Sequence, residues 1–301
     1  MLAHAQLVFF FAALLSGAGA GLISRRAASA GCGQSHSFVG STGTFSIESS
    51  GGTRSYLIHL PSSYNVNVPL PLLVAYHGSG DTPSNFENTS RFSEESVNPN
   101  MVTVYPQGVD GNWEGPTYAT PGVSDKIFTT DLVNHIKDNY CIDVTRVYAA
   151  GHSNGGGFVN TLACSSGHGG QFAAFAPVSG AMYTDVSGND DCDPARSPLP
   201  MMETHGGADP TIPYYGGQGR GGPLPAIPEW LSRWAGRDLC GSSTVTNLTN
   251  GVHHTVWNCA SLAGILQHYK IDGHDHSWPG SNSEIDISPL IIGFVSKQRI
   301  P

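Results

Sequence analysis

Short apolar runs alternate with longer segments of helical spacing along most of the 301-residue chain. The runs LLVAY at 72–76 and MVTVY at 101–105 are continuously apolar, as strands buried on both faces of a parallel sheet should be. The run TRSYLIHL at 53–60 alternates between polar and apolar residues, which is typical of a half-buried strand. We expect further strands over residues 147–150, 173–179, 200–204 and 265–270.

The segment 124–140 has the pattern of an amphipathic helix. Ser124 can cap its N-terminus, and one face carries Phe128, Leu132, Val133, Ile136 and Tyr140 at helical spacing. We expect further helices over 154–163, 228–236 and 285–297, and a surface loop over the Gly- and Pro-rich residues 216–228. Strands that alternate with helices in this way predict an α/β protein with a central, mostly parallel sheet flanked by helices.

The N-terminal residues have the features of a secretory leader. An apolar core, LVFFFAALL at 7–15, is followed by Ala18-Gly19-Ala20, an A-x-A cleavage pattern, so residues 1–20 are expected to be a signal peptide. Arg25-Arg26 is either a processing site after a short pro-segment or a solvated pair. The apolar core is too short to span a bilayer, and no other stretch is long enough. We therefore expect a secreted protein whose single domain covers residues 32–301.

Composition and net charge indicate which kinds of binding partner are not expected. Charged residues make up 12% of the chain, against about a quarter in ordinary proteins, while 38 Gly and 20 Pro indicate a loop-rich globular protein. The formal net charge is −9 and no basic cluster is present. Nucleic acid and anionic membranes are therefore not expected as partners.

Six cysteines follow the leader, and an even number in a secreted chain predicts three disulfides. They are Cys32, Cys141, Cys164, Cys192, Cys240 and Cys259. We favour a Cys240–Cys259 pair, because a turn is expected near 247–251 between them. None has the C-x-x-C spacing of a zinc or redox site. The sequons at Asn88 and Asn247 predict two glycosylation sites.

The stretch RVYAAGHSNGGGF at 146–158 carries the clearest chemistry. It places Gly151-His152-Ser153-Asn154-Gly155, a G-x-S-x-G pentapeptide, between an expected strand and an expected helix. That context is the one a nucleophile elbow requires, with Ser153 raised on a tight turn at a helix N-terminus. The N–H of Asn154 would then face a developing oxyanion. Glycines at 155–157 would cost an ordinary helix roughly 1 kcal/mol each relative to alanine, and close backbone approach would explain them.

A serine nucleophile needs a base and an acid, which in α/β-hydrolases follow it in the order Asp or Glu, then His. Asp209 lies just beyond the strand 200–204, and Asp191 and Asp193 are weaker alternatives without a clear strand before them. His274 and His276 both follow the last expected strand, and the residues alone leave that choice open.

The remaining histidines can be explained without a role as the catalytic base. His205 is expected to support the acid loop by hydrogen bonding, and His253-His254 resemble a solvated pair. A metal site built on the H-x-H of 274–276 lacks a matching carboxylate–histidine cluster, so no metal is expected.

The second oxyanion donor is expected in the loop after the strand 72–76. That strand is followed by His77-Gly78-Ser79-Gly80, where a backbone N–H of Ser79 or Gly80 could point toward the same position as that of Asn154.

Several segments together resemble one family. They are YPQG (105–108), WEGPTYATPGVSD (113–125), CIDVTRVYAAGHSNGGGF (141–158), AFAPVSGAMY (174–183), HGGADPTIPY (205–214) and HSWPG (276–280). In these segments the chain is similar to secreted fungal feruloyl esterases of carbohydrate esterase family 1, types C and D. The resemblance implies an α/β-hydrolase fold, a triad of Ser153, Asp209 and His276, and no cofactor.

The resemblance also implies a substrate. We expect hydrolysis of feruloyl esters on plant cell-wall arabinoxylan by a monomer, with Trp113 and Trp278 lining an apolar slot for the aromatic acid. Acetylxylan esterases and polyhydroxybutyrate depolymerases share parts of these motifs and are alternatives. A more distant alternative is an inactive, carbohydrate-binding hydrolase homologue.

Overall fold

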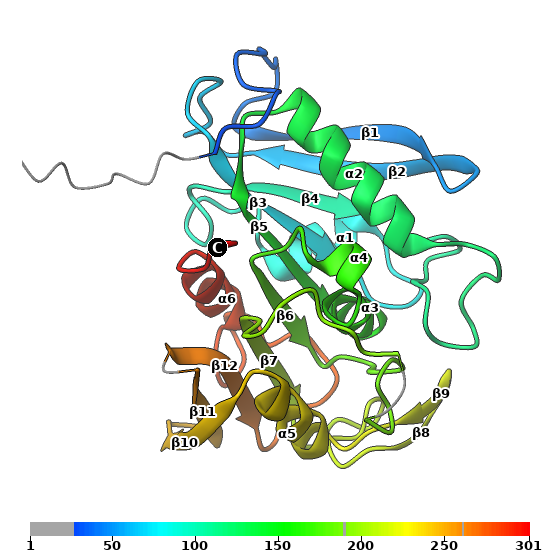
Figure 1. Ribbon diagram of the computed structural model, residues 1–301, viewed down its shortest axis with the longest axis vertical. Helices are drawn as coiled ribbons and strands as arrows, with labels where there is room; N and C mark the ends of the chain where they lie inside the picture. Colours follow the sequence, from blue (N-terminus) through cyan, green and yellow to red (C-terminus); the bar gives the residue numbers. More distant parts are fainter. Residues whose placement is uncertain (1–26, 189–190, 261) are drawn as a thin grey trace, which may run out of the picture.

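The computed structural model describes residues 27–188, 191–260 and 262–301 (Figure 1). Its centre is a ten-stranded sheet in the order β1-β2-β4-β3-β5-β6-β7-β12-β11-β10. These strands are β1 (Ser41–Ser49), β2 (Gly52–Leu60), β3 (Leu70–Tyr76), β4 (Val102–Pro106), β5 (Ile142–His152), β6 (Ala174–Val178), β7 (Met201–Gly206), β10 (Cys240–Asn247), β11 (Val252–Cys259) and β12 (Leu262–Ile271).

The middle of the sheet is parallel. Six strands, from β4 through β3, β5, β6 and β7 to β12, pair in parallel. Antiparallel strands extend it at both edges, β1 and β2 at one and β11 and β10 at the other. The expected α/β architecture with a mostly parallel sheet is confirmed.

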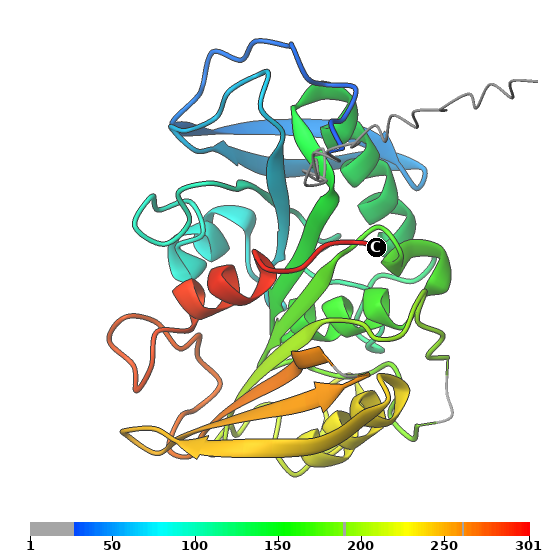
Figure 2. The same cartoon turned by 60° about the vertical axis from the view of Figure 1, so that its left-hand side comes forward.

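Helices cover both faces of the sheet. They are α1 (Pro83–Ser90), α2 (Asp125–Asn139), α3 (Asn154–Ala163), α4 (Ser166–Gly169), α5 (Ile227–Arg237) and α6 (Ile287–Val295). The buried side chains of α2, α3 and α5 join one hydrophobic cluster, and those of α1 and α6 join the other. Figure 2 shows α1 and α6 on one side of the sheet and α2 on the other. α2 follows its sequence pattern closely, since the Ser124 hydroxyl accepts from the N–H of Ile127 and the expected apolar face is buried.

The stretch 216–228 is not the plain loop that its glycines and prolines suggest. It forms a short hairpin of β8 (Gly217–Gly219) and β9 (Gly222–Leu224), and α5 begins at Ile227. The hairpin projects from the lower right of the molecule in Figure 1. His253 and His254, expected before the last strand, lie on β11 and are partly buried.

Three disulfides close loops of 109, 28 and 19 residues. They are Cys32–Cys141, Cys164–Cys192 and Cys240–Cys259. The third is the pair favoured from the sequence, and it joins β10 to β11 across the expected turn. The leader and the Arg25-Arg26 pair lie outside the described residues. Among the residues described, no helix has the length and apolar character needed to cross a membrane.

Candidate active site

Ser153 lies on the sharp turn between β5 and α3. Its backbone angles are φ 55° and ψ −118°, and its side chain makes no capping hydrogen bond to the helix that follows. A positive φ is uncommon for a residue with a side chain and marks a strained position. The turn is held by hydrogen bonds from Ser153 N–H to the Val178 carbonyl and from Ala181 N–H to the Ser153 carbonyl. This is the geometry of the expected nucleophile elbow.

The glycines around Ser153 allow this turn to pack against its neighbours. A Cβ at Gly155 would overlap the carbonyl oxygens of Tyr76 and His77 at the end of β3. A Cβ at Gly157 would overlap the carbonyl oxygen of Ala181. The side-chain-free face of α3 therefore lies directly against backbone, which is why the sequence accepts three consecutive glycines in a fully buried helix.

Ser153, His276 and Asp209 form an unbroken line of hydrogen bonds. His276 Nε2 lies 2.8 Å from Ser153 Oγ, and His276 Nδ1 lies 2.7 Å from Asp209 Oδ2. Asp209 follows β7 and His276 follows β12, so all three residues stand at the carboxyl ends of parallel strands. Since the carboxylate can only accept, Nδ1 of His276 carries the proton and Nε2 is free to accept the serine O–H.

The Asp209 carboxylate is fixed in place on its other oxygen. Oδ1 accepts from the N–H groups of Thr211 and Ile212, each at 2.8 Å. Burial alone would raise the pKa of Asp209, but the hydrogen bonds from His276 and Ile212 outweigh it and hold the pKa below its ordinary value. Asp209 is therefore ionised at neutral pH and can orient the imidazole.

The alternative acid Asp193 and the alternative base His274 form hydrogen bonds with other groups. His274 Nδ1 lies 2.8 Å from a Glu284 carboxylate oxygen, and its Nε2 lies 3.1 Å from the Ser277 carbonyl. Asp193 accepts from the Ser166 hydroxyl at 2.7 Å. The structure thus brings His276, and not His274, to Ser153, and it brings Asp209, and not Asp193, to His276.

His152 is a site residue that the sequence analysis did not single out. Its Nε2–H donates to the backbone carbonyl of His276 at 2.8 Å, and the two rings lie 5.1 Å apart. Burial, together with the charge that His276 can carry, lowers the pKa of His152 to about 4. His152 is therefore neutral at neutral pH and holds the backbone of His276 without adding charge. Its place inside the pentapeptide was the available signal.

The loop after β3 lies beside Ser153, and one of its two candidate oxyanion donors is already hydrogen-bonded elsewhere. A Cβ at Gly78 would lie 3.5 Å from the Ser153 Cβ, which places this loop at the nucleophile. The N–H of Gly80 donates to the Gly111 carbonyl at 2.8 Å, so Gly80 is engaged and the expectation that it is an oxyanion donor is corrected. Within the described part of the chain, the N–H groups of Ser79 and Asn154 donate to no backbone carbonyl. Those two groups remain the candidate donors.

A polar and aromatic cluster surrounds Ser79. The Ser79 hydroxyl donates to Asn112 Oδ1 at 2.6 Å and accepts from Arg220 Nη2 at 2.6 Å. The Arg220 guanidinium, at the tip of the β8–β9 hairpin, stacks 4.0 Å above the Tyr118 ring. Tyr118 meets Tyr183 edge to face, and the Tyr183 hydroxyl accepts from the N–H of Gly221 in the same hairpin. The hairpin and two tyrosines thus border the loop beside Ser153.

The two tryptophans expected to line an apolar slot lie in the core instead. Trp113 has no exposed surface, stacks on Phe158, and donates its Nε1–H to the His77 carbonyl. Trp278 is 6% exposed, lies edge-on to Phe86 and Phe92, and donates to the Ser288 hydroxyl. Trp113 holds the loop after β3 from behind, and neither ring presents a face to a substrate.

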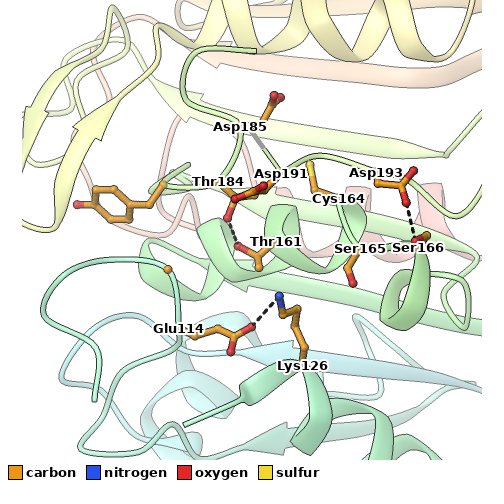
Figure 3. A pocket seen from close by; sticks show the side chains of 12 residues that line it. Glu114, Lys126, Thr161, Cys164, Ser165, Ser166, Thr184, Asp185, Asp191 and Asp193 are labelled. Carbon is orange, nitrogen blue, oxygen red and sulfur yellow. Dashed lines mark hydrogen bonds and ion pairs between the residues drawn. The ribbon is translucent and has the colours of Figure 1, made fainter. Parts of the chain in front are cut away.

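Figure 3 shows a separate polar pocket of about 470 Å³ beside α3. Its wall includes Thr161 of α3, which shares a hydrogen bond with Thr184, and Glu114, which lies 3.6 Å from Lys126 Nζ. Asp191 and Asp193 also line it. The pocket shares Gly115 and Tyr183 with a neighbouring hollow of about 410 Å³ against the β8–β9 hairpin. A polar surface therefore adjoins the tyrosine cluster.

One group of side chains in the described ranges has metal-like spacing, formed by Cys164, Asp185 and Cys192. The two sulfurs are joined in a disulfide, and Asp185 accepts hydrogen bonds from Arg233 and Arg237. These atoms are already engaged with protein groups. The sequon residues Asn88 and Asn247 are both exposed.

Comparisons with known proteins give a consistent result. Residues 47–218 match the family described as "Putative esterase". Feruloyl esterase B of Piromyces equi is 29% identical over 169 residues, which cover 54% of this chain and 31% of that protein. The bifunctional acetylxylan esterase/xylanase XynS20E of Neocallimastix patriciarum is 28% identical over 79% of this chain and 33% of its own length. The chain thus spans about a third of each of these relatives.

A solved structure shares the architecture. The acetyl xylan esterase from Aspergillus awamori superposes with a TM-score of 0.59 at 18% identity, over 84% of this chain and 99% of that one. At that level of identity the likeness concerns the fold alone.

Proposed function

The chain belongs to this esterase family, and we propose that it is a secreted serine esterase that hydrolyses feruloyl esters on plant cell-wall arabinoxylan. Its fold is the α/β-hydrolase fold. One observation carries the proposal: the hydrogen bonds from Ser153 through His276 to Asp209, at 2.8 and 2.7 Å, at the carboxyl ends of three parallel strands.

The acylation step follows from the protonation of these groups. As Ser153 Oγ attacks the ester carbonyl carbon, its proton moves to His276 Nε2, and Asp209 stabilises the imidazolium that forms. The carbonyl oxygen becomes an oxyanion, and we assign its stabilisation to the N–H groups of Asn154 and Ser79. When the C–O bond breaks, His276 returns the proton to the sugar oxygen, and the acid stays on Ser153 as an ester.

Deacylation repeats the sequence with water. His276 takes a proton from a water molecule, whose oxygen attacks the acyl carbon. Collapse of the second oxyanion breaks the bond to Ser153 Oγ, which recovers its proton from His276. The residues named need no cofactor for either step.

An aromatic acid is the acyl group that we favour. Tyr118 and Tyr183 give a partly apolar border to the loop beside Ser153, and Arg220 adds hydrogen-bond donors at the same place. The similarity to a feruloyl esterase supports this choice. The similarity to a bifunctional acetylxylan esterase/xylanase makes acetate the alternative, and it supports a xylan-linked ester as the substrate.

Secretion is part of the proposal. The apolar leader of residues 1–20 and three disulfides both fit an oxidising compartment. The exposure of Asn88 and Asn247 is compatible with glycosylation at both. We propose a single catalytic domain over residues 32–301 that acts as a monomer.

The test compares three substrates on the secreted protein: methyl ferulate, p-nitrophenyl acetate and a hydroxybutyrate oligomer. We expect kcat/KM for methyl ferulate to exceed the other two, because only ferulate uses the tyrosine border. Ser153→Ala should lower kcat by about 10⁶-fold, because the nucleophile is lost.

Other outcomes have distinct meanings. Activity on acetate or hydroxybutyrate alone would keep the serine mechanism and contradict the feruloyl assignment. A folded protein that hydrolyses none of the three would favour an inactive carbohydrate-binding homologue.

A further inference from the structure

A second cluster of ionisable side chains lies behind Asp209, away from solvent. Glu203 and His205 on β7 have no exposed surface, and His268 on β12 is 3% exposed. The proposed triad does not use these residues. Burying a charged or titratable group is unfavourable unless it is paired, so a buried carboxylate with two imidazoles requires a reason.

Both ring nitrogens of His205 face groups that accept hydrogen bonds. Nδ1 lies 3.0 Å from Glu203 Oε1, and Nε2 lies 2.8 Å from the Ile212 carbonyl. Nε2 is also 3.5 Å from Asp209 Oδ2, the oxygen that accepts the hydrogen bond from His276 Nδ1–H. A neutral imidazole can donate from one nitrogen only, so with Glu203 ionised this arrangement requires His205 to be an imidazolium.

The remaining partners of Glu203 are compatible with its ionisation. Its second oxygen, Oε2, lies 2.6 Å from His268 Nδ1. His268 Nε2 lies 3.1 Å from the Tyr214 hydroxyl, which can donate to it and so leave the ring N–H at Nδ1. Glu203 then has a charged imidazolium on one oxygen and the His268 ring nitrogen near the other.

The elements packed around His205 contribute one cation, Lys270, and it is already paired with a carboxylate. The neighbouring strand β6 (AFAPV) has no ionisable residue. On the other side, Lys270 of β12 is the register partner of His205, but its Nζ lies 2.7 Å from Asp272 Oδ1. The Tyr214 ring meets the His205 ring edge to face at 5.9 Å. Glu203 and Asp209 are thus the anions that face His205.

We propose that Glu203 and His205 form a permanent buried ion pair whose imidazolium sets the charge that Asp209 presents to His276. The inference rests on the proposed function, because it assigns a positioning and tuning role within that triad. Glu203 orients His205, and His205 holds the Asp209 loop through the Ile212 carbonyl. Burial alone would lower the pKa of His205, but the hydrogen bond and charge of Glu203 raise it above the ordinary value.

The ion pair should change how kcat/KM depends on pH. An imidazolium beside Asp209 partly cancels the negative charge that would stabilise protonated His276. Removing it leaves the negative charge of Asp209 uncompensated, which favours the charged, inactive form of the triad. The acid limb of kcat/KM should therefore move to higher pH.

We would measure kcat/KM against pH for the wild type, His205→Gln, Glu203→Gln and His254→Gln. His205→Gln should move the acid limb upward by about half a unit to one unit, and lower the plateau by about tenfold because Asp209 is held less firmly. Glu203→Gln should shift the limb in the same direction. His254 lies outside the cluster, bonded to Gln267 on the same sheet, and its variant should keep the wild-type limb.

A lower plateau with an unmoved limb in both cluster variants would overturn the tuning role, because a purely structural defect does not change a titration. A second measurement uses the wild-type protein alone, so it tests the ion pair even if the variants do not fold. In nitrogen-15 spectra of the wild-type imidazoles recorded at rising pH, one histidine should keep both ring nitrogens protonated after a free imidazole has lost its proton. If every doubly protonated signal disappeared at the pH at which a free imidazole titrates, or below it, the ion pair would be overturned.

These readouts separate the inference from the proposed function. A wild-type protein without esterase activity would contradict the proposed function, while the spectra would still establish or refute the ion pair. An active wild type with no persistent imidazolium would contradict the ion pair alone.

Discussion

Ser153 shows at the scale of one residue how function and stability compete. Its φ of 55° and ψ of −118° suit glycine better than a residue with a Cβ. The strain is retained because it raises the hydroxyl toward His276. Strained conformations of this kind cost on the order of 1–3 kcal/mol each and cluster at functional sites.

This strain predicts an unusual order of stability. Ser153→Gly should be more stable than Ser153→Ala by about 1 kcal/mol, because glycine relieves the positive φ and alanine does not. Both variants lack the Ser153 hydroxyl and should be equally inactive. Their stabilities therefore differ only through the Cβ that alanine keeps and glycine lacks. Urea denaturation measures the difference, and equal midpoints for the two variants would show that the turn is not strained.

At this scale the sequence pointed to some residues that the structure brings together and misplaced others. Ser153 and Asp209 could be placed from strand–loop context, whereas the choice of His276 over His274 depended on the family resemblance. Trp113 and Trp278 were misjudged because a large aromatic ring beside a motif packs in the core as readily as in a slot. Gly80 was misjudged because its acceptor, the Gly111 carbonyl, lies in a loop that no local pattern connects to it.

At the scale of the element, α3 depends on close backbone contact rather than on side-chain packing. Every residue of this ten-residue helix is buried, and its glycine face meets the end of β3 and the segment around Ala181. The helix N-terminus, and with it the Asn154 N–H, is positioned by this contact.

A pair of glycine substitutions separates close contact from helix propensity. Gly157→Ala should destabilise the protein by about 1–3 kcal/mol, because its Cβ would overlap the Ala181 carbonyl oxygen. Gly293→Ala, in the exposed face of α6 with open space around it, should stabilise by about 0.5–1 kcal/mol. Thermal unfolding of the two variants gives the comparison. A stabilising Gly157→Ala would contradict the packing described for α3.

The elements found from the sequence were those with strong periodicity. The helix expected over 154–163 has those bounds, and the helix expected over 124–140 is α2 with its two cap residues. The edge strands β1 and β10 are mostly exposed and rich in Ser, Thr and Gly, so they lack the apolar alternation that marks a half-buried strand. The β8–β9 hairpin was hidden for the same reason.

At the scale of the whole molecule, the parallel sheet is what assembles the site. Ser153 and His276 are 123 residues apart in sequence, and His276 and Asp209 are 67 apart. Because β5, β7 and β12 run in parallel, the loops at their carboxyl ends meet at one edge of the sheet, where α/β proteins carry their sites. The alternation of strands and helices allowed this fold class to be predicted, but not the side-chain contacts behind Asp209.

The central claim is that Ser153 is a nucleophile activated by His276 and Asp209, and labelling with a serine-directed phosphonate tests it most directly. We expect one adduct per chain, on Ser153, and none in Ser153→Ala. Asp209→Asn should slow labelling by about 10³- to 10⁴-fold, because His276 would lose its correct tautomer. Asp193→Asn, the matched acid bonded to Ser166, should label at the wild-type rate. An adduct on another residue, or a rate that Asp209→Asn leaves unchanged, would contradict the account.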